Sequence, residues 1–154
     1  MTEQLRINKM KAEDINRISD IILEENLDGF EELEWINKSI DDPFAYFFTA
    51  FYDDELVGYC GTYHNTTMEA YDFHYFKIGS VTVKKEYCRK GIGRALIIRA
   101  IDTARELGLD KIKLEVDTKS MAVKLYESLG FKVEKTERNF YDYGGDAYIM
   151  WRNE

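Results

Sequence analysis

The sequence predicts an α/β (α+β) fold built as one domain. Three observations lead to this prediction: β-branched and aromatic runs typical of strands, apolar residues spaced three or four positions apart as on helices, and a helix-like segment that separates two strands. A helix of that length can connect strands that run parallel, whereas short turns connect antiparallel strands. A length of 154 residues fits a single domain over residues 1–154.

The first half of the chain combines two amphipathic helices with strands. Ile18 and Ile22 share one helix face. The next helix ends before Pro43, because the residue preceding a proline avoids helical geometry. Asp53-Asp54 separates two aromatic, β-rich runs, which predicts a hairpin. The expected elements are a strand at 5–8, helices at 12–25 and 30–40, and strands at 44–51, 56–64 and 75–83.

The second half contains the strictest alternation in the chain. Ile112, Leu114 and Val116 face one side of a strand, and the charged residues between them face the other. Gly108 and Gly130 stand where helices are expected to end, since glycine adopts the left-handed conformation of a helix C-terminus at little cost. The expected elements are helices at 93–107 and 122–129 and strands at 111–117, 131–136 and 147–151.

A β-branched run, a basic loop and a helix follow one another over 81–107. Glycines in the loop let a ligand approach the backbone, and the first N–H groups of the helix have no intrahelical partner, which favours an anion. Arg89, Lys90 and Arg94 add positive charge. Gly91-Ile92-Gly93 alone is more typical of a tight strand-to-helix turn, but its context favours a phosphate-binding loop. The spacing matches neither a nucleoside-triphosphate loop nor a dinucleotide fingerprint.

Composition and charge narrow the class of protein. Hydrophobic residues make up 45% and charged residues 32%, an ordinary globular balance. The net charge of −8 argues against a nucleic-acid partner, which needs a basic face, and is compatible with a cationic acceptor such as an amine. No apolar run reaches membrane-spanning length, and the N-terminus lacks the apolar core of a signal peptide. A cytoplasmic protein without membrane contact is expected.

The cysteines and histidines do not have the spacing of metal ligands, so no metal site is expected. Cys60 and Cys88 are expected to be free thiols. His64 and His74 are interpreted as surface or strand residues rather than catalytic bases. A monomer and a homodimer both remain open.

Three motifs in series carry a family resemblance. They are Val81-Thr82-Val83 followed by Cys88-Arg89-Lys90-Gly91-Ile92-Gly93; Leu114-Glu115-Val116 followed by Ala122 and Leu125-Tyr126-Glu127-Ser128-Leu129-Gly130-Phe131; and Arg138-Asn139-Phe140-Tyr141 followed by Asp146-Ala147-Tyr148-Ile149-Met150. Over essentially its whole length the chain resembles the GNAT superfamily of acetyl-CoA-dependent N-acetyltransferases, and the last two motifs resemble its ribosomal-protein alanine N-acetyltransferase group. The resemblance implies a single-domain GNAT-like fold: a mixed, mostly antiparallel sheet, splayed in the middle, with helices on both faces.

The resemblance also implies the residues that bind acetyl-CoA. The strand would hold the pantetheine arm and polarise the acetyl carbonyl, and the loop would bind the pyrophosphate. Cys88 departs from the arginine or glutamine usual in the family, so Arg89 and Lys90 are expected to supply its charge. The connection after Glu115 is one residue short, which places Lys119 or Ser120 where an asparagine usually contacts pantetheine. The implied cofactor-binding residues are Val81, Thr82, Val83, Cys88, Arg89, Lys90, Gly91, Ile92, Gly93, Arg94, Lys119 and Ser120.

Two residues are candidates for proton transfer. The resemblance places the general base at Glu115, and its position opposite the apolar face of the strand agrees; the alternative is a strand residue paired with Lys113 or another cation. Tyr126 is the candidate general acid for the coenzyme A thiolate, because a phenol keeps its proton at neutral pH. Spacing alone would place Tyr126 in the core with its hydroxyl hydrogen-bonded.

The acceptor is a primary amine, and a protein or peptide N-terminal α-amine is the leading hypothesis. Two alternatives stand beside it: a small-molecule amine such as a polyamine, amino acid or aminoglycoside, and a non-catalytic domain that senses acetyl-CoA. An acidic segment and a set of late tyrosines are expected to flank the acceptor, or else to be surface residues. They are Glu24, Glu25, Asp28, Glu31, Glu32 and Glu34, with Tyr141, Tyr143 and Tyr148.

Overall fold

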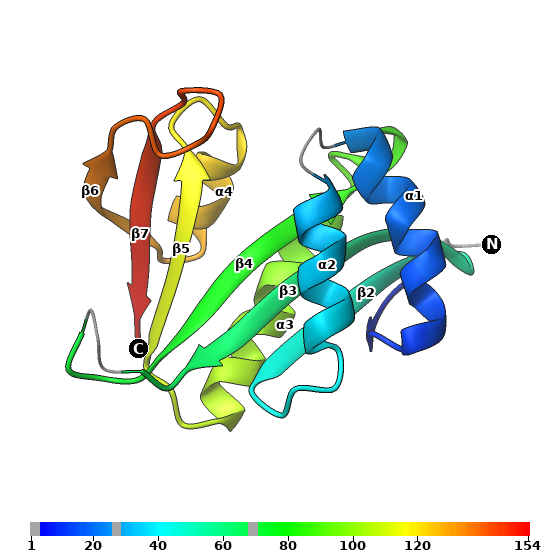
Figure 1. Cartoon of the computed structure of the whole chain (residues 1–154), viewed down its shortest axis with the longest axis horizontal. Helices are drawn as coiled ribbons and strands as arrows, with labels where there is room; N and C mark the ends of the chain where they lie inside the picture. The colour runs from blue at the N-terminus through cyan, green and yellow to red at the C-terminus, as the bar shows by residue number, and fades with distance from the viewer. Residues whose placement is uncertain (1–3, 26–28, 68–70) are drawn as a thin grey trace.

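Seven strands form one mixed sheet in the order β1-β2-β3-β4-β5-β7-β6 (Figure 1). The computed structural model describes residues 4–25, 29–67 and 71–154. The strands are β1 (Leu5–Lys9), β2 (Ala45–Tyr52), β3 (Glu55–Asn65), β4 (Tyr75–Val83), β5 (Lys111–Asp117), β6 (Lys132–Glu137) and β7 (Ala147–Asn153). The helices are α1 (Ile15–Glu25), α2 (Gly29–Ser39), α3 (Ile92–Glu106) and α4 (Ala122–Ser128). This order confirms the expected sequence of elements.

The beginning of α1 differs from the expected helix at 12–25. Residues Ala12–Asp14 form a 3₁₀ turn, and the α-helix starts at Ile15. The Asp14 carboxylate accepts a hydrogen bond from the Lys11 backbone N–H at 2.9 Å. This local bond satisfies a backbone donor at the entry and fixes a tighter first turn. None of the helices in the described residues is long and apolar enough to cross a membrane.

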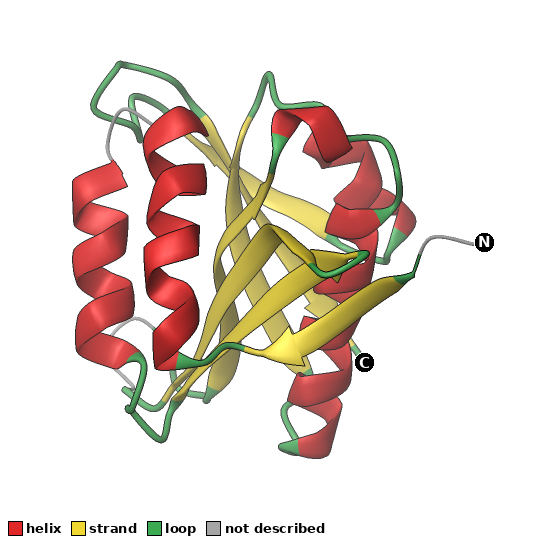
Figure 2. Cartoon of the chain, turned by 90° about the vertical axis from the view of Figure 1, so that its right-hand side faces the viewer, coloured by secondary structure: helices red, strands yellow, loops and turns green. Residues whose placement is uncertain are grey.

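Helices cover both faces of the sheet (Figure 2). On one face, α1 and α2 pack against strand residues such as Phe47 and Tyr59. On the other face, α3 and α4 cover a larger core that includes Phe76, Ile97 and Leu114. Alternation along β2 and β3 sends neighbouring side chains such as Phe47 and Phe48 to opposite cores, as strand geometry requires. The expected helices on both faces are thus confirmed.

The sheet divides between its two central strands. β4 and β5 run parallel but pair at three positions, the last of which joins Ile78 to Leu114. A bulge at Gly79 then shifts the register of β4 against β3, and bulges bend a strand and increase its twist. The two strands meet near their lower ends in Figure 1 and diverge above. The expected splayed sheet is confirmed, and Glu115 is the first residue of β5 beyond the last pair.

Candidate active site

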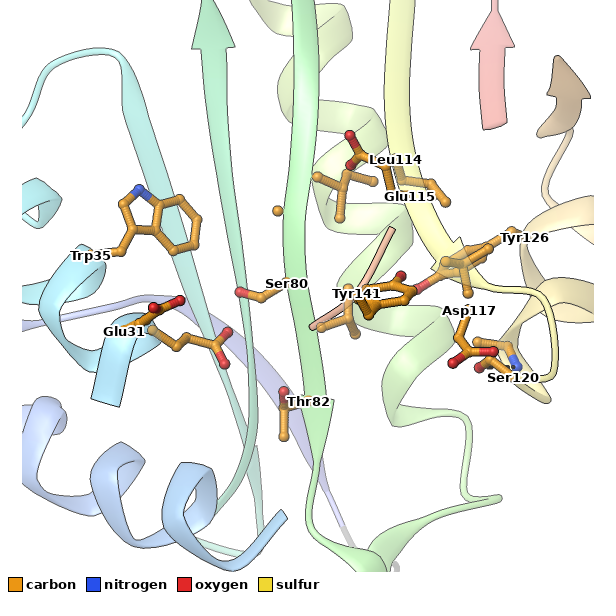
Figure 3. Close-up of a pocket in the computed structure, with 16 residues that line it drawn as sticks. Glu31, Trp35, Ser80, Thr82, Leu114, Glu115, Asp117, Ser120, Tyr126 and Tyr141 are labelled. Carbon is orange, nitrogen blue, oxygen red and sulfur yellow. Dashed lines mark hydrogen bonds between the residues drawn. The ribbon is translucent and has the colours of Figure 1, made fainter. Parts of the chain in front are cut away.

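A cleft of about 580 Å³ occupies the opening between β4 and β5. Figure 3 shows Glu31 and Trp35 of α2 on one side of β4, and Tyr126 and Tyr141 on the other, near β5. The cleft thus lies between secondary-structure elements that are far apart in the sequence. Its lining residues are Glu31, Glu32, Trp35, Ile78, Gly79, Ser80, Val81, Thr82, Leu114, Glu115, Val116, Asp117, Ser120, Ala122, Tyr126 and Tyr141.

One edge of β4 faces the cleft instead of a strand. From Ser80 to Val83, β4 pairs with β3 on one side, while its ladder with β5 has already ended. Backbone groups on the open edge therefore need other partners, and an amide-containing ligand arm could supply them. Val81 and Thr82 line the cleft here, whereas Val83 packs against the core beneath α3. This edge fits an extended pantetheine-like arm.

The loop after β4 leads directly into α3 and has the shape of an anion cradle. Gly91 caps the helix with a positive φ of 81°, and a Cβ placed there would meet nothing within 4 Å. The backbone N–H groups of Ile92, Gly93 and Arg94 are in the first turn, where helices have no internal acceptors. A phosphate at this point would meet these donors and the positive end of the helix dipole. The loop thus fits a pyrophosphate, although its residues lie outside the lining of the cleft.

The basic side chains of this loop point in different directions. The Lys90 ammonium lies 5.5 Å from the centre of the Tyr52 ring. Arg94 reaches the Ser128 hydroxyl of α4 at 3.4 Å. Arg89 is exposed and adopts a positive φ of 65°. Cys88 is exposed, with its sulfur 3.6 Å from the Lys84 carbonyl oxygen. Positive charge therefore surrounds the cradle, while the backbone provides its shape.

The turn after β5 contains Lys119 and Ser120, the two residues that could replace the asparagine that usually contacts pantetheine. It places them differently. Ser120 lines the cleft, and its hydroxyl accepts the Ala122 backbone N–H at 3.1 Å, at the start of α4. Lys119 has an exposed side chain, and its backbone N–H donates to Asp117 at 2.8 Å. Ser120, rather than Lys119, is the residue that the fold brings to the cleft.

Glu115 lies at the apex of the cleft and is ion-paired. Its carboxylate forms a salt bridge with Lys77 of β4, and its second oxygen lies 3.7 Å from the Lys113 ammonium. Burial lowers the pKa of Lys77, and the Glu115 charge opposes that shift. The side chain of Glu115 is 17% exposed and lines the cleft. A carboxylate offers about four lone-pair positions, so these cations leave capacity for a water or an amine.

Tyr126 agrees with both interpretations of the sequence: it is a core residue and it also reaches the cleft. Its side chain is buried at 8% exposure and its ring packs edge-on against Phe131, as expected for a core residue. It also lines the cleft, as an acid would. Burial, followed by the nearby Cys60 and Tyr141, raises the pKa of its phenol. The hydroxyl therefore keeps its proton across the physiological range.

Opposite walls of the cleft contain part of the expected acceptor site. Glu31 and Glu32 reach it from α2, and Tyr141 from the β6–β7 connection. Tyr143 stacks parallel to Tyr141 with 5.2 Å between ring centres. The Tyr143 hydroxyl also donates to the Asp117 carboxylate, which raises the pKa of Tyr143 to about 12.

Other residues of that expected site lie elsewhere. Tyr148 packs against the core on the α3 side of the sheet, away from the tyrosine wall. Glu34 pairs with Lys38 at 2.7 Å on an exposed helix surface, and Glu24 is exposed on α1. Asp28 and the side chain of Glu25 lie outside the described residues.

Trp35 was not anticipated from the sequence. Its indole covers Gly61 and Gly79 on neighbouring strands, where an added Cβ would lie 2.8 Å and 2.9 Å from the ring. Two glycines at such positions make room for a large side chain, and this signal is visible only once the strand register is known. Ser80 and Asp117 were also missed as lining residues. Neither histidine lines the cleft.

Comparisons with known proteins agree with this geometry. The Acetyltransferase (GNAT) family matches residues 13–131. An N-alpha-acetyltransferase of Sulfurisphaera tokodaii is 30% identical, covering 96% of this chain and 92% of that protein. The [ribosomal protein bS18]-alanine N-acetyltransferase of Escherichia coli is 40% identical over 46% of this chain and 51% of its own. The solved structure of Arabidopsis thaliana NAA60 with a bisubstrate analogue shares the fold, with a TM-score of 0.85 at 16% identity, covering 97% of this chain and 98% of that one.

The geometry of the site agrees with the matched family. Both the opening between β4 and β5 and the glycine loop at the start of α3 fit a protein that binds acetyl-CoA. The open edge of β4 and the loop fit the two parts of coenzyme A to which the resemblance assigned them. Acetyl-CoA is therefore the cosubstrate, and the chain belongs to the acetyltransferase (GNAT) family as an acetyl-CoA-dependent N-acetyltransferase.

Proposed function

We propose that the protein transfers the acetyl group of acetyl-CoA to the α-amine at the N-terminus of a protein or peptide. The observation that carries the proposal is the cleft at the sheet opening, which brings a carboxylate, a buried phenol and an open strand edge together. Similarity to an N-alpha-acetyltransferase along nearly the whole chain supports the same acceptor.

The proposed base is Glu115. An amine attacks a thioester only as the neutral species, and an α-ammonium has a pKa of about 8, against about 10.4 for lysine. An α-amine thus needs little assistance, which suits a carboxylate already engaged by two ammonium groups. Glu115 would accept the proton directly or through one water as the amine attacks. Backbone N–H groups on the open edge of β4 would stabilise the charge that develops on the acetyl oxygen.

The proposed acid is Tyr126. Acetyl-CoA supplies the acetyl group as a thioester, and the departing thiolate needs a proton. The Tyr126 phenol holds one because burial raises its pKa. It lines the same cleft as Glu115, so one residue can take a proton while the other gives one. The compartment, proposed to be the cytoplasm, does not enter this chemistry.

A small-molecule amine is the second candidate acceptor. The observation in its favour is the pair of acidic residues, Glu31 and Glu32, on the α2 wall of the cleft. These carboxylates would attract the second ammonium of a polyamine as readily as they would attract the ammonium of a peptide N-terminus. Peptides differ from polyamines in presenting backbone amides, so only a peptide acceptor should depend on its second and third residues.

The first experiment measures thiol release from acetyl-CoA with a panel of acceptors. Short peptides with free N-terminal Ala, Ser or Met are compared with spermidine and free lysine. We expect turnover with the peptides, in a manner that depends on their first residues. Turnover confined to the small amines would replace the proposal with the second candidate. Binding of acetyl-CoA without turnover of any acceptor would instead favour a sensor domain.

Tyr143 allows a separate test of the acceptor wall. Replacing Tyr143 with Phe removes its hydrogen bond to Asp117 but keeps the ring that stacks on Tyr141. Tyr143 is largely exposed, so this bond is worth about 1 kcal/mol rather than the larger value of a buried bond to a charged group. If that energy orders the acceptor wall, the acceptor KM should rise about fivefold. Steady-state kinetics should show an unchanged KM for acetyl-CoA. Phe140→Leu is the matched control, because Phe140 contacts Tyr141 in the same loop; an equal rise in both variants would contradict a specific role for the Tyr143 hydroxyl.

A further inference from the structure

Three side chains meet on one face of the sheet where the two central strands begin to part. Lys77 of β4 pairs in register with Lys113 of β5, and Lys113 pairs with Trp151 of β7. Glu115 follows two positions along β5, on the same face. Its carboxylate contacts Lys77 and lies 3.7 Å from Lys113. The fold therefore places one acid against a row of two cations at the apex of the cleft.

The Lys113 ammonium is enclosed by aromatic rings. It lies 5.4 Å from the ring centre of Tyr71, and 5.9 Å from those of Tyr75 and Trp151. These rings also pack edge-on against one another, with centres 5.2 to 5.6 Å apart. The Tyr75 hydroxyl accepts a hydrogen bond from Asn65 at 2.7 Å, which fixes it further. Lys113 thus sits in an aromatic cage built from the segment before β4, β4 itself and β7.

The aromatic cage helps to stabilise two lysines beside a single carboxylate, an arrangement that is unfavourable where the side chains are so poorly exposed to water. The side chains of Lys77, Lys113 and Glu115 are 12%, 15% and 17% exposed, so the group carries one excess positive charge in a poorly hydrated place. Aromatic faces carry negative partial charge and attract a desolvated ammonium by about 2 kcal/mol. Among the described residues, the rings therefore keep Lys113 in position with Glu115 as its one carboxylate partner.

We propose that Lys113 is a positioning residue for acetyl transfer, which holds the Glu115 carboxylate toward the cleft and is itself held by the cage of Tyr71, Tyr75 and Trp151. The inference rests on the role of Glu115 in the proposed function. Lys113 is absent from the lining of the cleft, so its effect passes through Glu115. Small displacements of a catalytic group are costly, and about 1 Å can lower a rate by about 100-fold.

The test compares lysines of one strand. Lys113→Met removes the charge and keeps the length of the side chain, and Lys113→Arg keeps the charge. Lys111→Met is the matched control, because Lys111 lies two positions earlier on β5, with its ammonium over Phe73 and 3.4 Å from Asn153. We expect Lys113→Met to lower kcat about tenfold, which is part of the roughly 10²–10⁴-fold that a positioned base contributes, because the base itself remains. Lys113→Arg should recover most of that loss, and Lys111→Met should change kcat less than about twofold.

A purely structural role would be recognised by two further measurements. Calorimetry gives the number of coenzyme A sites per chain, which stays at one if Lys113→Met is folded and falls if it is not. Glu115→Gln supplies a double-mutant cycle: with Glu115 absent, Lys113→Met should have almost no further effect on kcat. Additive losses in the cycle, a lowered site count that accounts for the loss, or an equal effect of Lys111→Met would each overturn the inference.

The cycle also separates this inference from the proposed function. The acceptor is the peptide that the wild-type enzyme turns over fastest. If Glu115→Gln lowers kcat while Lys113→Met does not, Lys113 has no positioning role, but Glu115 is still supported as the general base. If Glu115→Gln leaves kcat unchanged, the proposed base is wrong and the inference falls with it. An absence of wild-type turnover with any peptide contradicts the acceptor alone.

Discussion

Replacement of Gly91 with Asp is expected to abolish coenzyme A binding. A carboxylate there would stand at the start of α3, where the pyrophosphate is expected to meet the first N–H groups of the helix. Two like charges about 4 Å apart near a protein surface repel by about 4 kcal/mol. A 100-fold loss of affinity corresponds to only about 2.8 kcal/mol. Calorimetric titration with coenzyme A should therefore show at least this loss.

A matched variant separates charge from backbone strain at Gly91. The residue has a φ of 81°, so any side chain pays about 1 to 2 kcal/mol for the left-handed conformation. Gly91→Ala carries this strain without the charge, and a Cβ would meet nothing within 4 Å. We expect Gly91→Ala to lower the melting temperature but to bind coenzyme A within about tenfold of the wild type. Unaltered binding by Gly91→Asp would exclude the loop from the site.

Replacement of Tyr126 with Phe is expected to lower kcat by about tenfold or more, since a positioned general acid contributes roughly 10²–10⁴-fold and water can supply part of that effect. The variant keeps the ring that packs on Phe131 and removes only the hydroxyl. Affinity for acetyl-CoA should change less than about twofold, because the proton is needed only as the thiolate leaves. Stopped-flow mixing with a peptide acceptor, combined with calorimetry, would measure both quantities.

The pH dependence provides the control for Tyr126. Burial raises the pKa of its phenol, so the wild-type enzyme keeps the proton at every pH below the ordinary tyrosine value of about 10. The acid function is thus present throughout this range and is lost only above the raised pKa. Tyr126→Phe should lower kcat by the same factor at each pH from about 6 to 9. An unchanged kcat would return Tyr126 to a role in the core alone.

Local spacing in the sequence was sufficient to predict the order of strands and helices. The alternation at 111–117 and the helical spacing around Leu96 and Ala100 determine those elements through their buried faces, independent of distant residues. The length of the β4–α3–β5 crossover also predicted the parallel pairing. The extent of that pairing could not be read locally, because it ends at the bulge of Gly79, over which Trp35 from α2 packs.

The candidate site could be predicted only in part, because it too depends on the pairing of strands that are distant in the sequence. Spacing placed Glu115 opposite the apolar face of β5 and suggested Lys113 as a partner, two positions away on the same strand. Lys77, on another strand, became its salt-bridge partner through the register of two parallel strands, which no local pattern encodes. Likewise Tyr148, although close in sequence to Tyr141, packs against the core beneath α3 because of its place in the β7 alternation, whereas Tyr141 lines the cleft.

The parting of β4 and β5 also governs how the protein holds together. Three residue pairs join the four-stranded portion, β1 to β4, to the three-stranded portion formed by β5, β7 and β6, while α3 packs beneath both. So short a pairing is expected to open at a lower free energy than the longer ladders on either side. A molecule lodged in the cleft touches both portions and stabilises their closed arrangement by mass action. We therefore expect bound acetyl-CoA to hold the two portions of the sheet together, so that the melting temperature of the enzyme is highest when acetyl-CoA is bound.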